Sequence, residues 1–335
     1  MTKPKILLLG TVDYAEKQWQ DLTSVGDLIT PQAQNREAFI EECKSGKLDG
    51  VVAAYRTFGS VKITGRFDAD LVSVLPKSWR FLCHMGAGYD QIDAGPCSKR
   101  DPPLYVSNVP TAVDDATADT AIFLMLGALR NFNTSMSNLR KGEWKGKPAP
   151  ELGHDPRGKV LGILGMGGIG RNMSKKAAAF GMSTIYHNRR KLDDDTAGGA
   201  EYVSFEDLLR KSDVISLNLP LNPQTRHIIS KKEFDMMKKS CVLVNTARGA
   251  VIDETALVKA LEEEQIAGAG LDVFEEEPKI DPGLLKNDKV MLLPHMGTYT
   301  FETAVKMEEW TIDNVRMAVT EGKLKSIIPE QDGML

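Results

Sequence analysis

The sequence is poor in cysteine, and its cysteines form no recognisable motif. The 335 residues include only four of them: Cys43, Cys83, Cys97 and Cys241. No two have C-x-x-C spacing, and four cysteines in a chain of this length do not make a disulfide framework. We therefore expect free thiols and no metal site.

Long apolar runs are also missing. The longest, Ala121 to Leu129, is far shorter than the ~20 residues that span a bilayer. The apolar segment at the amino terminus is too short for a signal peptide. We expect a cytoplasmic protein that does not enter a membrane.

Neither sign of charge is in strong excess. The chain has 42 Lys and Arg against 46 Asp and Glu, a net charge of −4, and nothing in this balance indicates nucleic acid or an anionic membrane as a partner. Apolar residues make up 42%, as in ordinary globular proteins. At roughly 100–200 residues per domain, the length indicates two domains.

Short apolar runs alternate with amphipathic stretches along the whole chain, which is typical of βαβ units around a buried parallel sheet. A first set of predicted strands lies at 6–9, 50–54, 81–84 and 104–106. A second set lies at 160–164, 184–186, 214–217, 242–244, 267–271 and 290–293. The predicted fold is α/β, with two Rossmann-like doubly wound parallel-sheet domains and a cleft between them.

The helical pattern sets the domain boundaries. A long helix is predicted at 114–129, followed by a polar segment at 130–144 and a stiff linker at 146–150. A last helix at 301–320 presents an amphipathic face that we expect to pack on the first domain. The first domain would then be discontinuous, residues 1–110 and 300–335, and the second would span 111–299.

A glycine-rich loop directly follows the strand predicted at 160–164. It reads Gly165-Met166-Gly167-Gly168-Ile169-Gly170. The first glycine permits a tight turn, the second lets the backbone approach a pyrophosphate, and the third lets helix and strand pack closely. N–H groups at the start of the following helix can bind phosphates. The alternative is a glycine turn without a ligand, but the strand and helix around the loop favour a dinucleotide site.

The residue expected to contact the cofactor ribose indicates NADP(H). Many NAD enzymes place an acidic residue after the second strand, but this chain has Asn188 there, followed by Arg189 and Arg190. A carboxylate would repel the 2′-phosphate of NADP, whereas an amide beside guanidinium groups favours it. A solvated basic turn is the alternative. We predict NADP(H) as the preferred cofactor, with NAD(H) possible.

Arginine, acid and histidine follow three consecutive predicted strands, as Arg248, Glu277 and His295. Ligands of open parallel sheets bind beyond the carboxyl ends of the strands. Arginine can hold a carboxylate through two parallel hydrogen bonds, histidine can donate a proton near neutral pH, and an acid paired with an imidazole orients it and stabilises its charged form. Each residue alone could be structural; together they predict reduction of a keto acid.

The chain resembles the D-isomer-specific 2-hydroxyacid dehydrogenase family nearly from end to end. The resemblance runs through the segments 86–93, 108–119, 165–170, 220–227, 244–249, 270–278 and 294–297. Within the family the chain is most similar to fungal glyoxylate/hydroxypyruvate reductases, through residues 84–93 and 186–189. Asp119, where many members have glutamate, and Asn188 depart from the family pattern.

The resemblance implies a role for each matching residue. Arg248 would bind the substrate carboxylate and carbonyl, His295 would donate the proton, and Glu277 would keep His295 protonated. The backbone N–H groups of Ala87 and Gly88 would complete the carboxylate site. Asp272 would hold the nicotinamide carboxamide. The rest of the dinucleotide groove, which would also include His295, would be lined by Thr117, Leu219, Pro220, Thr225, Thr246, Ala247 and Gly297.

The implied protein is a homodimer that exchanges an arm near residues 112–139, with a flavodoxin-like substrate-binding first domain and a dinucleotide-binding second domain. It would reduce glyoxylate or hydroxypyruvate, with D specificity where the product is chiral. A larger 2-keto acid remains an alternative, as does a corepressor-like protein that binds dinucleotide without turnover. Glu277 argues against formate dehydrogenases of similar fold, which have glutamine there.

Overall fold

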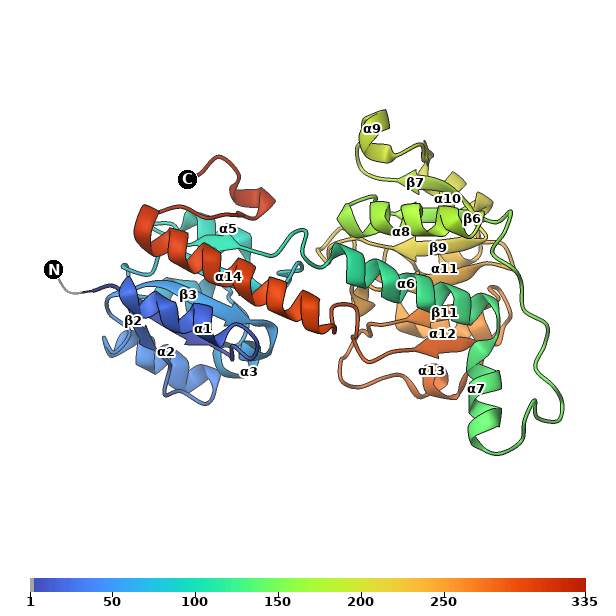
Figure 1. Ribbon diagram of the computed structural model, residues 1–335, viewed down its shortest axis with the longest axis horizontal. Coiled ribbons are helices and arrows are strands. Elements are labelled where there is room, and N and C mark those ends of the chain that lie inside the picture. Colours follow the sequence, from blue (N-terminus) through green and yellow to red (C-terminus); the bar gives the residue numbers. More distant parts are fainter. Residues whose placement is uncertain (1–2) are drawn as a thin grey trace. The chain divides into compact units, whose positions relative to one another are not determined.

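The computed structural model describes residues 3–335, so the first two residues of the predicted first domain lie outside the described part. The chain divides into two compact units. The first runs to Val113 and resumes at Thr300–Leu335, and the second is Asp114–Tyr299. Figure 1 shows the return of the last helix to the first unit.

The first unit is built on a five-stranded parallel sheet in the order β2-β1-β3-β4-β5. Its strands are β1 (Lys5–Leu9), β2 (Asp27–Ile29), β3 (Val51–Thr57), β4 (Phe81–Met85) and β5 (Tyr105–Ser107). Its helices are α1 (Glu16–Gln20), α2 (Arg36–Lys44), α3 (Val61–Thr64), α4 (Ala69–Val74), α5 (Ala94–Lys99) and α14 (Phe301–Glu321), with short 3-10 turns η1 (Asp21–Ser24), η2 (Phe58–Ser60) and η4 (Pro329–Gln331).

Alternate residues of these strands face opposite layers, because side chains of a strand point to its two faces in turn. In β4, Phe81 and Cys83 pack with residues of α1 and α14, whereas Leu82 packs with residues of α2, α4 and α5. Figure 1 shows α1 and α14 together on one face. Both faces of the sheet are therefore covered, which explains why the strands are nearly continuous apolar runs.

The second unit has a seven-stranded parallel sheet in the order β12-β11-β10-β9-β6-β7-β8. Its strands are β6 (Val160–Leu164), β7 (Ser183–His187), β8 (Glu201–Tyr202), β9 (Val214–Leu217), β10 (Val242–Asn245), β11 (Gly268–Leu271) and β12 (Val290–Leu292). The strand order reverses between β6 and β9, and such a switch point is where an open α/β sheet binds its ligand.

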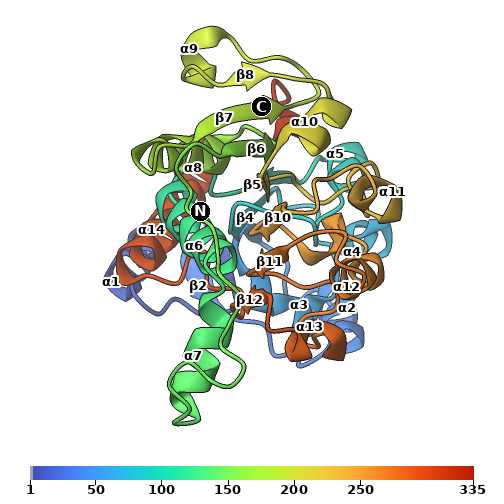
Figure 2. The same ribbon diagram turned by 90° about the vertical axis from the view of Figure 1, so that its right-hand side faces the viewer.

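Helices cover both faces of this second sheet, as Figure 2 shows. The helices are α6 (Asp114–Leu129), α7 (Phe132–Arg140), α8 (Gly168–Ala179), α9 (Asp194–Ala197), α10 (Phe205–Lys211), α11 (Lys231–Phe234), α12 (Glu254–Glu262) and α13 (Pro282–Lys286), with a 3-10 turn η3 (Gly249–Val251). One core lies between the sheet and α6 and α8, and the other lies under α10 to α13. The prediction of two doubly wound parallel sheets is confirmed.

Among the elements that the sequence prediction missed are two strands and one helix of three turns or fewer. The strands are the short edge strands β2 and β8, of three and two residues. The helix is α7, which lies in the segment expected to be merely polar; its apolar residues Phe132, Met136 and Leu139 recur at helical spacing, but none of them is buried. No helix within residues 3–335 is long and apolar enough to cross a membrane.

Candidate active site

The glycine-rich loop has the conformation that its three glycines predict. Gly165 follows β6 with φ of +97°, a region that other residues rarely adopt. A Cβ on Gly167 would meet no atom within 4 Å, so the backbone there is open to a ligand. A Cβ on Gly170 would lie 2.7 Å from the Gly165 carbonyl oxygen, so α8 packs closely on the strand. These features fit a pyrophosphate at the start of α8.

Asn188 is part of the same loop structure. Its side-chain Oδ1 accepts a hydrogen bond of 2.7 Å from the Met166 N–H, and its carbonyl oxygen accepts one of 3.1 Å from the Tyr202 hydroxyl. The amide therefore supports the turn of the phosphate loop. Arg189 and Arg190 follow it on the surface and are exposed. His187 is the last residue of β7.

An acid that sequence reasoning missed lies against the phosphate loop. Asp114 begins α6, and a Cβ on Gly168 would overlap its carboxylate. Burial raises the pKa of Asp114 from 3.8 to about 6, although the Arg171 charge opposes the shift. No spacing in the sequence signals this contact, because it joins the start of α6 to the start of α8, some fifty residues away.

His295 and Glu277 form a hydrogen-bonded pair. His295 Nδ1 lies 2.8 Å from Glu277 Oε2, and Glu277 Oε1 accepts a bond of 3.0 Å from the Phe274 N–H. Since an ionised carboxylate can only accept, Nδ1 carries the proton of this bond. Nε2 is then the ring atom at which a proton can be gained or lost.

The charges around Glu277 keep it ionised. Burial alone would raise the pKa of Glu277, but the hydrogen bond and charge of His295 oppose burial. The Phe274 N–H and the Arg248 charge act in the same direction, and the pKa falls below its ordinary value of 4.5. Histidine, glutamate and arginine are thus electrostatically coupled, as expected for a group that stabilises an imidazolium.

Asp272 fixes the loop that carries His295. It follows β11 and is only 1% exposed. Its carboxylate oxygens accept bonds of 2.6 and 2.8 Å from the N–H groups of Met296 and Gly297, and its carbonyl oxygen accepts one of 2.8 Å from the His295 N–H. Burial raises the pKa of Asp272, although these amide donors oppose the shift. The structure thus places Asp272 as a support of His295; the predicted nicotinamide contact remains a prediction.

Arg248 lies on the turn after β10, and the neighbouring Asn245 shapes that turn. The buried Asn245 accepts a bond of 3.0 Å from the Ala247 N–H and donates one of 2.8 Å to the Arg248 carbonyl. Arg248 Nη1 donates to the Ala247 carbonyl at 2.7 Å. A Cβ on Gly249 would collide with the Phe274 backbone, so the turns after β10 and β11 are in contact. Sequence reasoning missed Asn245, whose one signal is a polar residue ending a buried strand.

The remaining groove residues of the second unit lie on the same edge of its sheet. Thr117 lies beside Gly297, since a Cβ on Gly297 would be 3.3 Å from the Thr117 Cγ2. The turn after β9 is closed by Thr225, whose hydroxyl donates to the Pro220 carbonyl at 2.6 Å. Leu219 Cδ2 would be 3.1 Å from a Cβ on Gly165. Among the described residues Thr246 Oγ1 has no hydrogen-bond partner although it is buried. Such an atom is expected to bind a ligand or water.

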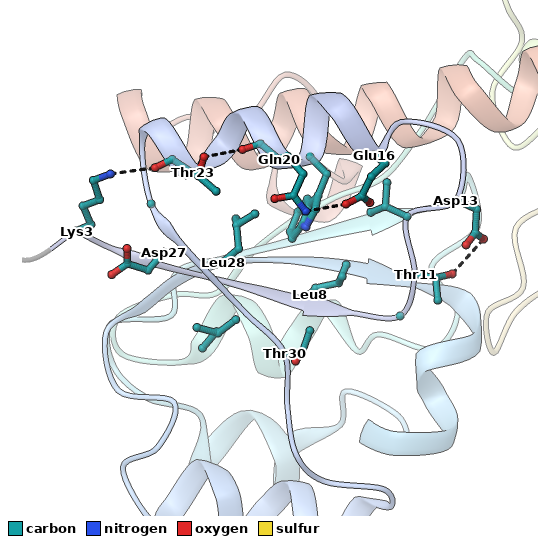
Figure 3. Close-up of a pocket in the computed structure, with 15 residues that line it drawn as sticks. Lys3, Leu8, Thr11, Asp13, Glu16, Gln20, Thr23, Asp27, Leu28 and Thr30 are labelled. Carbon is teal, nitrogen blue, oxygen red and sulfur yellow. Dashed lines mark hydrogen bonds between the residues drawn. The ribbon is translucent and has the colours of Figure 1, made fainter.

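Ala87 and Gly88 belong to the first unit, where they follow β4. All three carbonyl oxygens of Gly86–Gly88 accept hydrogen bonds from residues of that unit. The same unit has a cavity of about 890 Å³ beside β1, β2 and α1, which Figure 3 shows. None of the predicted site residues lines it. No metal-binding cluster of His, Cys, Asp or Glu is found within residues 3–335, and the four cysteines are buried free thiols.

Comparison with known proteins identifies the family. Residues 122–297 match the family model described as D-isomer specific 2-hydroxyacid dehydrogenase, NAD binding domain. The chain belongs to the D-isomer specific 2-hydroxyacid dehydrogenase family. It is therefore an NAD(P)-dependent enzyme, and the corepressor-like alternative is set aside.

The similarity to individual family members covers almost the whole chain. The chain is 53% identical to 4-methyl-2-oxopentanoate reductase A of Aspergillus oryzae over 98% of each chain. It is 47% identical to glyoxylate reductase 1 of Saccharomyces cerevisiae, over 98% of this chain and 95% of that one. The crystal structure of a glyoxylate reductase from Paecilomyes thermophila is 52% identical, with a TM-score of 0.96 over 99% of this chain and 100% of that one.

Proposed function

We propose that this enzyme reduces a small 2-keto acid, glyoxylate or hydroxypyruvate, to its 2-hydroxy acid, with D specificity where the product is chiral. NADPH is the preferred cofactor and NADH a possible one. The first unit binds substrate and the second binds the dinucleotide. The observation that carries the proposal is the His295–Glu277 pair, 2.8 Å apart and coupled to the charge of Arg248. Glyoxylate reductases among the similar proteins support the substrate class.

Each residue has a task that its surroundings permit. The bound nicotinamide supplies the hydride that reduces the carbonyl carbon. His295 donates a proton from Nε2 to the oxygen that becomes the hydroxyl, and Glu277 holds the ring through Nδ1. Arg248 binds the carboxylate through two parallel hydrogen bonds. The N–H groups of Ala87 and Gly88 bind the same carboxylate.

The dinucleotide contacts are assigned to the loop Gly165–Gly170 and to the turns after the other strands. Thr246 Oγ1, buried and without a partner in the described chain, is available to a ligand. NADPH preference is supported by the absence of a carboxylate at Asn188 and by the exposed guanidinium groups that follow it.

The enzyme is proposed to be a homodimer that uses the arm near residues 112–139. Four large apolar side chains on α6 and α7 support this proposal, because they are 40–57% exposed: Phe123, Phe132, Met136 and Leu139. Large apolar side chains gathered on a surface usually mark an interface. Size-exclusion chromatography with light scattering measures the mass of the protein in solution, and a monomeric mass at micromolar concentration would contradict the proposal.

A second candidate function has a specific observation in its favour. The Aspergillus oryzae protein, 53% identical, is named for a branched keto acid. Wild-type kcat/KM should be measured for glyoxylate, hydroxypyruvate and 4-methyl-2-oxopentanoate with both cofactors, from the loss of nicotinamide absorbance. A higher kcat/KM for the branched acid than for glyoxylate would replace the first candidate by the second.

The role of His295 is tested by His295→Ala. Turnover should fall ~10²–10⁴-fold, because general acid catalysis contributes about that much, while dinucleotide affinity changes little. His227→Ala is the matched control: His227 also has a positive φ, and its Nε2 lies 2.7 Å from Glu275. It should retain turnover within several-fold. Equal losses of turnover and dinucleotide affinity in His295→Ala would show that His295 is structural.

A further inference from the structure

Two buried polar residues lie side by side beneath the turn Gly86–Gly88. Arg56 of β3 and His84 of β4 are register partners in the parallel sheet, and they are 0% and 1% exposed. Arg56 Nη1 lies 3.0 Å from His84 Nδ1, and His84 Nε2 lies 3.0 Å from the Gly88 carbonyl oxygen. The imidazole thus joins a guanidinium to the turn.

The chemistry of the two partners fixes the state of the imidazole. Burial lowers the pKa of Arg56 to about 10, so the guanidinium is still charged at neutral pH. A guanidinium has donors only, so His84 Nδ1 must accept. The Gly88 carbonyl can only accept, so Nε2 must carry the proton and donate it. His84 is therefore neutral, in the Nε2–H tautomer.

The hydrogen bond from His84 to Gly88 is one of three hydrogen bonds to carbonyl oxygens that orient the turn. The Gly86 carbonyl accepts from the Val109 N–H at 2.9 Å, and the Ala87 carbonyl accepts from Asn108 Nδ2 at 2.8 Å. Because N–H and C=O point in opposite directions across a trans peptide, these bonds direct the N–H groups of Ala87 and Gly88 away from the donors. The bond from His84 fixes the next peptide plane and thereby the end of the turn.

Burial of the Arg56 guanidinium has a free-energy cost. Its other terminal nitrogen donates to Gln91 Oε1 at 2.5 Å, a neutral acceptor. No acceptor in the described chain lies within hydrogen-bonding distance of its Nε, which is buried. The charge of Asp90 and the Phe67 ring, whose centroid lies 5.6 Å from the guanidinium carbon, stabilise this cation in part. Among the described residues no carboxylate is hydrogen-bonded to it, and burial of such a cation is unfavourable. Holding His84 in one tautomer is a function that such a donor-only group can perform.

We propose that His84 is a positioning residue, held by Arg56 as the neutral Nε2–H tautomer, which fixes the Gly88 carbonyl and so anchors the end of the turn whose Ala87 and Gly88 amides bind the substrate carboxylate. The inference rests on the proposed function, since it concerns the carboxylate site of that reaction. It assigns to Arg56 and His84 a task that requires no contact with substrate.

Two substitutions of similar size and polarity separate positioning from folding. In His84→Gln the amide nitrogen can occupy the place of Nε2 and reach Gly88, whereas in His84→Asn it reaches only the place of Nδ1. We expect KM for glyoxylate to rise at least tenfold in His84→Asn and only a few-fold in His84→Gln, with kcat less affected in both. Arg56→Lys, which keeps a charged donor, should resemble His84→Gln. Dinucleotide affinity, a property of the second unit, should stay within twofold.

The tautomer is read independently from the ¹⁵N shifts of the imidazole nitrogens at neutral pH. The His84 signals, identified as those lost in His84→Gln, should show a protonated Nε2 and an unprotonated Nδ1. An imidazolium or an Nδ1–H tautomer would overturn the inference, as would equal KM values for the Gln and Asn variants. Wild-type enzyme that fails to reduce any 2-keto acid would instead overturn the proposed function.

Discussion

Cofactor preference can be tested by a single atom-for-atom exchange, Asn188→Asp. The substitution leaves the phosphate loop intact, because one oxygen of the aspartate can still accept the 2.7 Å bond from the Met166 N–H. The other oxygen then carries a negative charge next to the two exposed arginines. The change is therefore electrostatic and nearly isosteric.

The expected size of the change in cofactor preference follows from Coulomb's law. At an effective dielectric near 20, two unit charges ~5 Å apart interact by about 3 kcal/mol, and a phosphate monoester carries about −1.5 to −2 charges. The turn is exposed, so solvent and salt reduce the repulsion about two- to threefold. A residual of about 1.5–3 kcal/mol predicts a ~10- to 100-fold shift in the ratio of kcat/KM for NADPH to that for NADH, toward NADH.

The assay compares initial rates with each cofactor at several ionic strengths, and the shift should shrink as salt is added. Asn287→Asp is the matched control. Its Oδ1 also accepts a backbone N–H, from Lys289 at 2.9 Å, but it precedes β12, the edge strand at the far end of the sheet from β7 and β8. It should leave the ratio unchanged. A ratio within twofold of wild type in Asn188→Asp would refute the charge argument.

Three further predictions concern charged groups. Arg248→Lys should raise KM for glyoxylate ~10- to 100-fold through loss of one charged hydrogen bond of about 1.5–3 kcal/mol. Arg226→Lys, whose arginine is exposed and paired with Glu275, should leave KM unchanged, and an Arg248→Lys KM equal to that of wild type would remove Arg248 from the site. Glu277→Gln should lower kcat ~10- to 100-fold at neutral pH. Because the pKa of Glu277 lies below 4.5, the wild-type enzyme should lose the rate contribution of the Glu277 carboxylate only as pH falls through that depressed pKa. Titration of Glu277 above pH 4.5 would contradict this expectation. The raised pKa of Asp114, about 6 against 3.8, favours the folded state fully below 3.8 and no longer above 6. Asp114→Asn should therefore unfold at a higher temperature than wild type above pH 6 and bind dinucleotide more tightly there. A difference in Tm between variant and wild type that stays constant from below pH 3.8 to above pH 6 would refute the raised pKa of Asp114.

Much of the fold was readable because buried parallel strands leave continuous apolar runs. Each of the ten predicted strands overlaps a strand of the structure, from β1 to β12. The two missed strands, β2 and β8, lie at sheet edges and are too short to leave such a run. The helix α7 was missed because its segment was interpreted as polar, although Phe132, Met136 and Leu139 recur in it at helical spacing.

The site was predictable only where one rule could place a residue. The rule that ligands bind at the carboxyl ends of strands selected Arg248, Glu277 and His295 as candidates, and the three follow neighbouring strands, β10, β11 and β12. It could not find Asp114 or Arg56, because their contacts depend on how two elements far apart in sequence pack together. Register and helix packing are properties of the assembled sheet, which composition and spacing do not encode locally.

The supports of the site bear on how family members can differ in substrate. The carboxylate and carbonyl are common to every 2-keto acid, and they are the groups assigned to Arg248, His295 and backbone amides. These residues are held by Asp272, Asn245 and, in the proposal above, His84, none of which needs to touch the variable group of the substrate. Selection between glyoxylate and a branched keto acid must then come from other side chains, by admitting or excluding that group. Arg248→Lys should accordingly weaken both substrates by the same factor, and an altered ratio of their kcat/KM values would place Arg248 among the residues that select by size.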